Sequence, residues 1–267
     1  MADSTDLDVA LQAVSAAVAI TEARRGGPLQ RFGKDGADFA TDVDRAVEQA
    51  ILEVIRAARP GDAILGEELG NSGPSGAARV WLVDPLCGTL NYAAGSPAYA
   101  VNVALAQGDD VLAAAVAEPA AGVVYFTDGN MAWRRHNDSP EVAQLQPSAA
   151  SRLVEVHLET DDPDGQGFSS ARYLRSSTFQ VLSPRFFGTG LPLAWVAGGQ
   201  RAGFVIPGKR DISVHFTAGI GLCRAAGCVL SGLHGEPLHL ANEGIVAAAD
   251  ATTHKLLLAG IAEQVQS

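Results

Sequence analysis

Apolar residues recur at every third or fourth position along two segments near the N-terminus, which is the spacing of one helix face. They are Leu7, Leu11, Val14 and Val18 in the first segment, and Val47, Ile51, Leu52 and Ile55 in the second. The pattern predicts helices over residues 5–25 and 44–59, the first broken by the Gly-Gly-Pro at 26–28 and the second by Pro60-Gly61. The Gly-rich, charged stretch between them, residues 30–42, is typical of a surface loop.

After residue 61 the pattern changes to short β-rich runs separated by Gly, Pro and Asp, which predicts a sheet. The runs are residues 63–68, 80–85, 99–107, 111–119 and 122–127. The second half alternates strands and helices: strands at 152–159, 202–208 and 244–249, and helices at 188–199 and 214–227. Polar residues at 134–151 indicate a seam between an N-terminal half, 1–140, and a C-terminal half, 150–267, that together form one α/β unit.

Composition narrows the function classes. The chain has 267 residues, of which 47% are hydrophobic, and a formal net charge of −11. An acidic surface repels nucleic-acid phosphates and anionic lipids, so we expect neither nucleic acid nor membrane as a partner. No apolar run is long enough for a membrane span and the N-terminus is acidic, which predicts a cytoplasmic protein. Its partner is then a small-molecule substrate.

Three cysteines make neither an even disulfide set nor a Cys-x-x-Cys pair, which is consistent with a reducing compartment. Cys223 and Cys228 fall on one predicted helix, five residues apart. Because that spacing is poor for a shared metal, we interpret them as packing residues.

Acidic residues mark the candidate chemistry. Asp44 lies at the start of the second helix, Glu67 and Glu68 end one strand, and Asp84 ends the next. Carboxylates that meet at one edge of a sheet are how proteins usually hold hard cations beside a substrate phosphate. Each feature is common as a solvated strand end or turn, so their combination and order carry the interpretation.

Four motifs occur in an order that resembles the inositol monophosphatase family, which consists of Mg²⁺-dependent, lithium-sensitive phosphatases. They are KDGADFATDVDRAVE (34–48), ILGEE (64–68), WLVDPLCGTLNY (81–92) and VHFTAGIGLCRAAGCVLSGLHGEPL (214–238). The resemblance covers nearly the whole chain. It implies a layered α/β fold, an inositol monophosphatase-like αβαβα sandwich, and a homodimer.

The resemblance also assigns roles. It implies a first metal site, suited to Mg²⁺, at Glu67, Asp84 and the carbonyl of Leu86. It places Thr89 and Asp44 in the catalytic machinery, with Thr89 helping to polarise the attacking water. The resemblance further implies that the backbone N–H groups of Gly88 and Thr89 bind the substrate phosphate. Gly188, Thr189 and Gly190, at a predicted helix start, and Lys34, in the first loop, are further substrate-binding candidates.

Two positions depart from the family. The family's second metal takes an Asp two residues after the Pro and the Asp of its Trp-Asp pair, and these are Cys87 and His215 here. Losing one carboxylate at about 4 Å forfeits roughly 4 kcal/mol, which is on the order of a thousandfold in affinity. Since Mg²⁺ prefers oxygen ligands, ordinary two-metal phosphatase activity is expected to be weak or lost.

Three explanations remain open for the two replacements. The first is a second site rebuilt for a different metal, because Cys87, His215 and Asp84 suit Zn²⁺ or a similar ion. Alternatively, His215 activates Cys87 as a nucleophile or acid–base partner without that metal. Or Cys87 is a small apolar filler and His215 caps a helix.

The leading function is therefore an enzyme for a small sugar- or nucleoside-phosphate-like metabolite, with chemistry that is altered or non-hydrolytic. Inositol phosphate is not favoured, because Val205 stands where the family often has an acidic residue. One alternative is a catalytically silent binding or regulatory protein. The other is a conventional phosphomonoesterase in which Asp211 substitutes for a lost carboxylate.

Overall fold

The computed structural model describes residues 4–34, 38–158, 168–208, 213–241 and 243–264. The chain divides into two compact units. Unit 1 comprises residues 1–144, 189–191 and 213–222, and unit 2 comprises residues 145–188, 192–212 and 223–267. Of the predicted site residues that the structure describes, Gly188 belongs to unit 2 and the others belong to unit 1.

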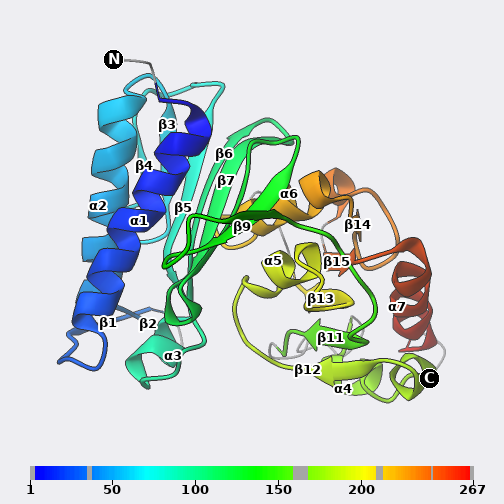
Figure 1. Ribbon diagram of the computed structural model, residues 1–267. Helices are drawn as coiled ribbons and strands as arrows, with labels where there is room; N and C mark the ends of the chain where they lie inside the picture. The colour runs from blue at the N-terminus through cyan, green and yellow to red at the C-terminus, as the bar shows by residue number, and fades with distance from the viewer. Residues whose placement is uncertain (1–3, 35–37, 159–167, 209–212, 242, 265–267) are drawn as a thin grey trace. The chain divides into compact units, whose positions relative to one another are not determined.

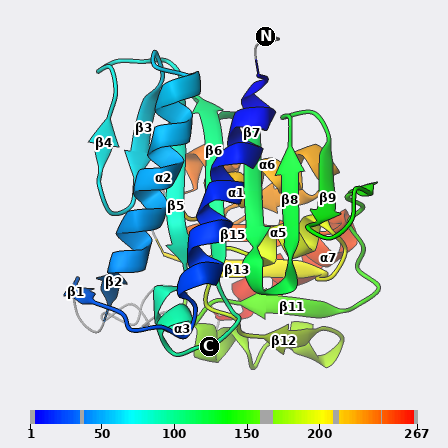
Figure 2. The ribbon, with the colours of Figure 1, turned by 60° about the vertical axis from the view of Figure 1, so that its left-hand side comes forward.

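Two long helices pack side by side on one face of a sheet in unit 1 (Figures 1 and 2). They are α1, Asp6–Arg24, and α2, Asp42–Ala58. Each begins with a capping box, in which a threonine side chain and an aspartate three residues later satisfy each other's backbone N–H groups. Thr41 and Asp44 form the box of α2, so that helix begins two residues before the predicted start.

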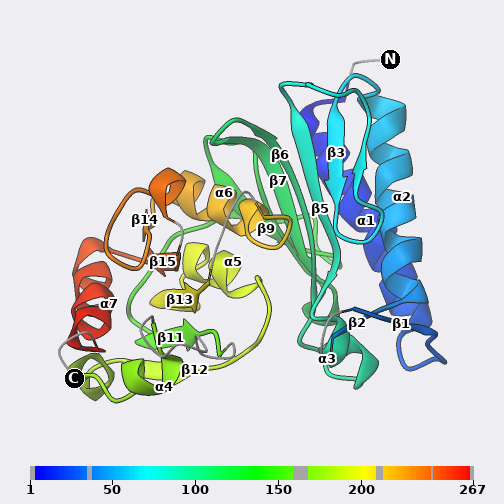
Figure 3. The same cartoon turned by 180° about the vertical axis from the view of Figure 1, so that it is seen from behind.

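The sheet of unit 1 has eight strands in the order β10-β9-β8-β7-β6-β5-β3-β4 (Figure 3). The pair β3–β5 is parallel and all other neighbours are antiparallel. The strands are β3, Ala63–Gly66; β4, Asn71–Ser72; β5, Val80–Cys87; β6, Ala100–Gln107; β7, Asp110–Glu118; β8, Val123–Thr127; β9, Ala132–His136; and β10, Val142–Gln144. Apolar side chains of β5–β8 form a core with the inner faces of α1 and α2.

Smaller elements complete unit 1. The hairpin of β1, Arg31–Gly33, and β2, Phe39–Thr41, lies where a plain surface loop was predicted. Helix α3, Thr89–Ala93, follows β5 directly. Helix α6, Thr217–Ala226, begins in unit 1 and ends in unit 2.

Unit 2 contains a five-stranded sheet in the order β12-β11-β13-β15-β14. Its strands are β11, Leu153–Val156; β12, Ser183–Arg185; β13, Gly203–Pro207; β14, Val229–Ser231; and β15, Gly244–Ala248. Helices α5, Pro192–Ala197, and α7, Ala251–Glu263, pack on its central strands, and the short α4, Ser170–Tyr173, contacts α7 (Figure 1). A second apolar core lies between this sheet and α7.

Within the described ranges, no helix combines the length and the apolar character needed to cross a membrane.

Candidate functional site

An irregularity in β5 positions the first two residues of the candidate site. Asp84 pairs with Asn102 of β6, but Cys87 pairs with Ala100, so the bulged strand has one residue more than its partner. Pro85 lies inside this interval and has no N–H to give to the ladder. Bulges turn side chains away from the regular alternation of a strand. Here the bulge accompanies the placement of Asp84 and Cys87 in one cluster.

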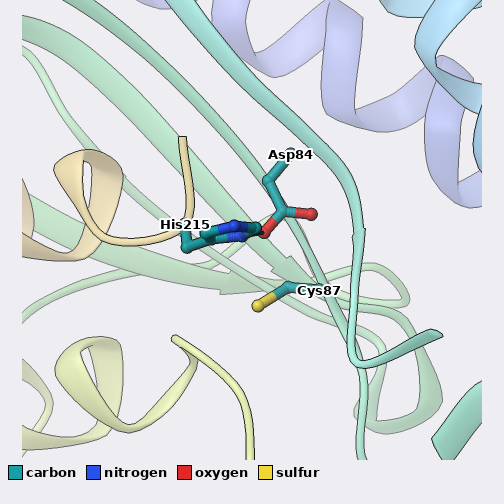
Figure 4. Close-up of side chains that lie close together, drawn as sticks. All are labelled: Asp84, Cys87 and His215. Carbon is teal, nitrogen blue, oxygen red and sulfur yellow. Dashed lines mark hydrogen bonds and ion pairs between the residues drawn. The ribbon is translucent and has the colours of Figure 1, made fainter. Parts of the chain in front are cut away.

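His215 reaches the same cluster from the turn before α6. The hydroxyl of Ser213 accepts the backbone N–H of His215, at 3.2 Å, and the Ser213 carbonyl accepts the Thr217 hydroxyl, at 2.8 Å. The Nδ1 atom of His215 lies 2.7 Å from Oδ2 of the fully buried Asp84. Figure 4 shows the imidazole against this carboxylate, with the Cys87 thiol beside them.

Gly190, in the loop before α5, also contacts this cluster. Its backbone N–H donates to the Cys87 sulfur, at 3.2 Å. A Cβ atom at this position would lie 2.4 Å from the carbonyl oxygen of His215. A side chain therefore does not fit, and glycine lets three chain segments meet. The neighbouring Thr189 uses its hydroxyl to accept the N–H of Leu191, at 3.2 Å.

The electrostatics favour an imidazolium–carboxylate pair over a thiolate. Burial alone would lower the pKa of His215, but the charges of Asp84 and Glu67 outweigh it and raise that pKa to about 9. Burial would raise the pKa of Asp84, yet His215 holds it below the usual value. Burial and the charge of Asp84 raise the pKa of the Cys87 thiol well above 9.0. Without a metal, these shifts favour the neutral thiol of Cys87. His215 forms its hydrogen bond with Asp84 and does not activate Cys87.

Glu67, predicted to bind the first metal, lies in a second acidic cluster together with Glu68. The Lys34 ammonium is 2.8 Å from Glu67 Oε1 and 2.6 Å from Glu68 Oε1. Burial and the negative charge of Asp84 raise the pKa of Glu67 to about 8, against the opposing effects of His215 and Lys34. Lys34, predicted to approach a ligand anion, is thus paired with the carboxylates.

Glu48 of α2 holds the Glu67–Glu68 segment in place and was missed from the sequence. Its buried carboxylate accepts the backbone N–H groups of Glu68, at 2.8 Å, and Leu69, at 2.9 Å. The available signal was a charged residue on the apolar face of the predicted helix, three positions before Ile51. Buried carboxylates require such partners, so Glu48 acts as a positioning residue.

The remaining predicted residues of unit 1 form a connected set. The Thr89 hydroxyl lies 2.7 Å from Asp44 Oδ1 and 3.1 Å from the Leu86 carbonyl oxygen. Asp44 also accepts the backbone N–H of Thr41, at 2.8 Å. Gly88 is the N-cap residue of α3 and immediately precedes Thr89. These contacts fix the Thr89 hydroxyl beside the carbonyl that was predicted to bind the first metal.

Two predicted residues are not placed with this group. Gly188 belongs to unit 2. Asp211, the alternative carboxylate, lies outside the described residues.

The Asp84–Cys87–His215 group fits a metal of borderline softness. One ligand atom from each residue lies within 4.8 Å of the other two. Oδ1 of Asp84 is buried and takes no hydrogen bond from the residues that the structure describes. A carboxylate, a thiol and an imidazole are a donor set that suits Zn²⁺, whereas Mg²⁺ prefers oxygen ligands throughout. The group therefore does not fit the family's second Mg²⁺.

Comparisons with known proteins identify the relatives of the chain. A model described as the Inositol monophosphatase family matches residues 2–267. The chain is 33% identical over 230 residues to the Inositol-1-monophosphatase ImpA of Mycolicibacterium smegmatis, covering 84% of this chain and 80% of that protein. It is 32% identical over 236 residues to the Nus factor SuhB of Pseudomonas aeruginosa, covering 85% and 84%.

Among solved structures, the extragenic suppressor protein suhB from Bartonella henselae superposes with a TM-score of 0.84 at 26% identity, covering 96% of this chain and 98% of that one. The predicted fold class, a mixed α/β layered fold of the inositol monophosphatase type, is confirmed.

Proposed function

Because the chain belongs to the inositol monophosphatase family, we propose that it is a phosphatase-type enzyme in which Asp84, Cys87 and His215 replace the second magnesium site. The observation that carries the proposal is the unpartnered, buried Oδ1 of Asp84 beside the Cys87 thiol and the His215 imidazole. Zn²⁺ or a similar ion is the expected occupant. A bound cation of this kind supplies a Lewis acid that polarises a phosphate oxygen.

The protein's own residues would bind the cations and orient the substrate. Glu67, Asp84 and the Leu86 carbonyl offer oxygen ligands for a first cation, with Mg²⁺ the expected metal. Thr89 presents a hydroxyl oriented by Asp44. The substrate is a small phosphate ester, with sugar and nucleoside phosphates favoured over inositol phosphate because Val205 is an apolar residue fully buried in β13. The same proposal includes a cytoplasmic homodimer, by resemblance to the family.

Phosphate release tests the activity. The metal-stripped protein is assayed on a panel of sugar and nucleoside phosphates with Mg²⁺ and, separately, with Zn²⁺. We expect weak release with Mg²⁺ from the parent and a gain of tenfold or more in Cys87→Asp/His215→Asp, which restores both carboxylates. Comparable Mg²⁺-dependent rates in parent and variant would contradict the replacement of the second site. His136→Asp/His239→Asp adds two carboxylates at exposed positions and serves as the control.

Cobalt binding tests the metal site without an activity assay. Co²⁺ bound through a thiolate gives a charge-transfer absorption band, which we expect in the parent and not in Cys87→Ser. A band that survives Cys87→Ser, or no Co²⁺ uptake by the parent, would overturn the assignment of Cys87 as a ligand.

A second candidate function is a catalytically silent binding protein. It is favoured by the Lys34 ammonium, which already forms ion pairs with Glu67 and Glu68, and by a relative named as a Nus factor. Absence of metal uptake, together with no phosphate release from either the parent or the double variant, would select it.

A further inference from the structure

Helix α6 ends in a turn that brings two cysteines together. The backbone N–H of Cys228 donates to the carbonyl of Cys223, at 2.9 Å, and that of Gly227 donates to the carbonyl of Arg224, at 3.1 Å. Gly227 has φ of 86°, the left-handed conformation that glycine adopts readily. This combination is the Schellman motif, in which the residues at the two ends of the longer hydrogen bond make a side-chain contact.

The residues at the two ends of that hydrogen bond are Cys223 and Cys228. The nearby Cys228 side chain, ahead of burial, raises the pKa of the Cys223 thiol. Cys223 is fully buried and its thiol donates to the Leu193 carbonyl, at 3.2 Å. Cys228 is half-buried. The expectation that both residues lie on one helix is wrong, because α6 ends at Ala226 and Cys228 follows the turn.

We propose that Cys223 and Cys228 form a dithiol site that a low-molecular-weight disulfide oxidises to an intrachain disulfide. Cys228, the more accessible residue, loses its proton to solvent, and its thiolate attacks one sulfur of the external disulfide. A mixed disulfide forms and one external thiolate leaves. The Cys223 sulfur then attacks the Cys228 sulfur and the bond to the external sulfur breaks; the departing external thiolate takes the Cys223 proton and leaves as a thiol. The two cysteines lose two electrons, and the external disulfide gains them.

The turn favours the second step because both cysteines are already ordered. A disulfide requires Cα atoms that are close and Cβ atoms that face each other. The hydrogen bond from Cys228 N–H to the Cys223 carbonyl holds the two backbones together. The effective concentration of the second thiol is therefore high, and the mixed disulfide is expected to be short-lived.

Peptide mapping of the full-length protein tests this proposal. Trypsin cleaves after Arg224, between the two cysteines, so a disulfide joins two peptides that are otherwise separate. After incubation with oxidised glutathione and alkylation of free thiols, we expect this linked pair in non-reducing mass spectrometry. The titratable thiols of the denatured protein should fall from the three cysteines of the chain to Cys87 alone.

Single variants separate the outcomes. Cys87→Ser should leave the linked pair unchanged, and Cys223→Ala should instead accumulate glutathione on Cys228. The proposal is overturned if the parent stops at a glutathione adduct, links Cys87 to either partner, or keeps all three thiols. Thiol mapping does not depend on catalysis, so its result is independent of the proposed phosphatase function.

Discussion

The ammonium group of Lys34 occupies a position that a metal ion would also favour. It makes ion pairs with Glu67, at 2.8 Å, and Glu68, at 2.6 Å, and about a quarter of its side chain is exposed. Like charges at this distance repel strongly in a partly buried site. If Glu67 holds the first cation, as proposed above, that cation and Lys34 compete for the same carboxylate.

Removing the charge of Lys34 should strengthen metal binding. For Lys34→Gln we expect divalent cations to bind about tenfold more tightly, a gain of roughly 1.4 kcal/mol. Isothermal titration calorimetry with Mn²⁺ measures the change directly. Lys255→Gln, which removes an exposed positive charge in unit 2, is the control and should leave the affinity unchanged. Unchanged or weaker binding in Lys34→Gln would show that the lysine does not compete.

For single residues, the sequence predicted which residues belong to the site better than it predicted which residues they contact. The motif resemblance identified Asp84, Cys87 and His215, and the structure places them in one cluster. The pairing of Lys34 with Glu67 was not foreseen, because a loop lysine has no spacing that marks its partner. Glu48 was passed over as a helix residue, although its carboxylate anchors the neighbouring acidic segment.

Between elements, an ion-pair network joins the start of α1 to the residues that precede β5. Asp6 Oδ1 accepts Arg59 Nε, at 2.7 Å, and Arg79 Nη2, at 2.8 Å. Arg79 also pairs with Asp62, at 3.0 Å, which in turn accepts the indole N–H of Trp81. The network links three elements whose apolar faces form the core of unit 1.

This network predicts a pH-dependent contribution to stability. Burial would raise the pKa of Asp6, but Arg79 and Arg59 outweigh it and lower that pKa below 3.8. Since the folded-state pKa lies below the unfolded-state value, the stabilisation is complete above the latter and is lost as the pH falls through the former. Asp6→Asn should lower the free energy of unfolding by about 1 kcal/mol at pH 7.

Urea unfolding at pH 7, 5, 4 and 3 measures this dependence. The difference between parent and Asp6→Asn should be constant from pH 7 to 5 and shrink toward pH 3. Glu53→Gln on α2, which removes an exposed carboxylate that accepts a hydrogen bond from Gln49, should give no comparable difference. A gap that stays constant down to pH 3 would mean that Asp6 acts through packing instead of charge.

Sequence predicted elements where apolar periodicity was strong and failed where other contacts define them. The predictions for α1, α2, β3 and β5–β8 are confirmed, with shifted ends. Strands β9 and β10 fall in or beside the polar stretch interpreted as a seam. β10 is the edge strand and all three of its residues are exposed, and most of β9 beside it is polar, so neither has the apolar run of a buried strand. Helix α6 begins at Thr217, three residues after the predicted start, since Ser213 and Thr217 bond to each other in the turn that carries His215.

For the whole molecule, the path of the chain favours unfolding of both units together, although the structure divides into two units. The chain passes between the units several times, because unit 1 takes residues 189–191 and 213–222 from within the second half. Helix α6 itself has residues 217–222 in unit 1 and its remaining turn in unit 2. Helix formation is cooperative along its length, so the loss of either unit disrupts an element of the other.

We therefore expect the metal-free protein to unfold in one calorimetric transition. A core substitution in either unit should lower the same melting temperature. The matched pair is Leu52→Ala in unit 1 and Leu257→Ala in unit 2, both deeply buried leucines. Each substitution should lower the free energy of unfolding by about 2–5 kcal/mol. For a chain of this size that corresponds to a fall in melting temperature on the order of 10 °C. Two resolved transitions, with each variant shifting only one, would mean that the units unfold independently and that α6 does not couple them.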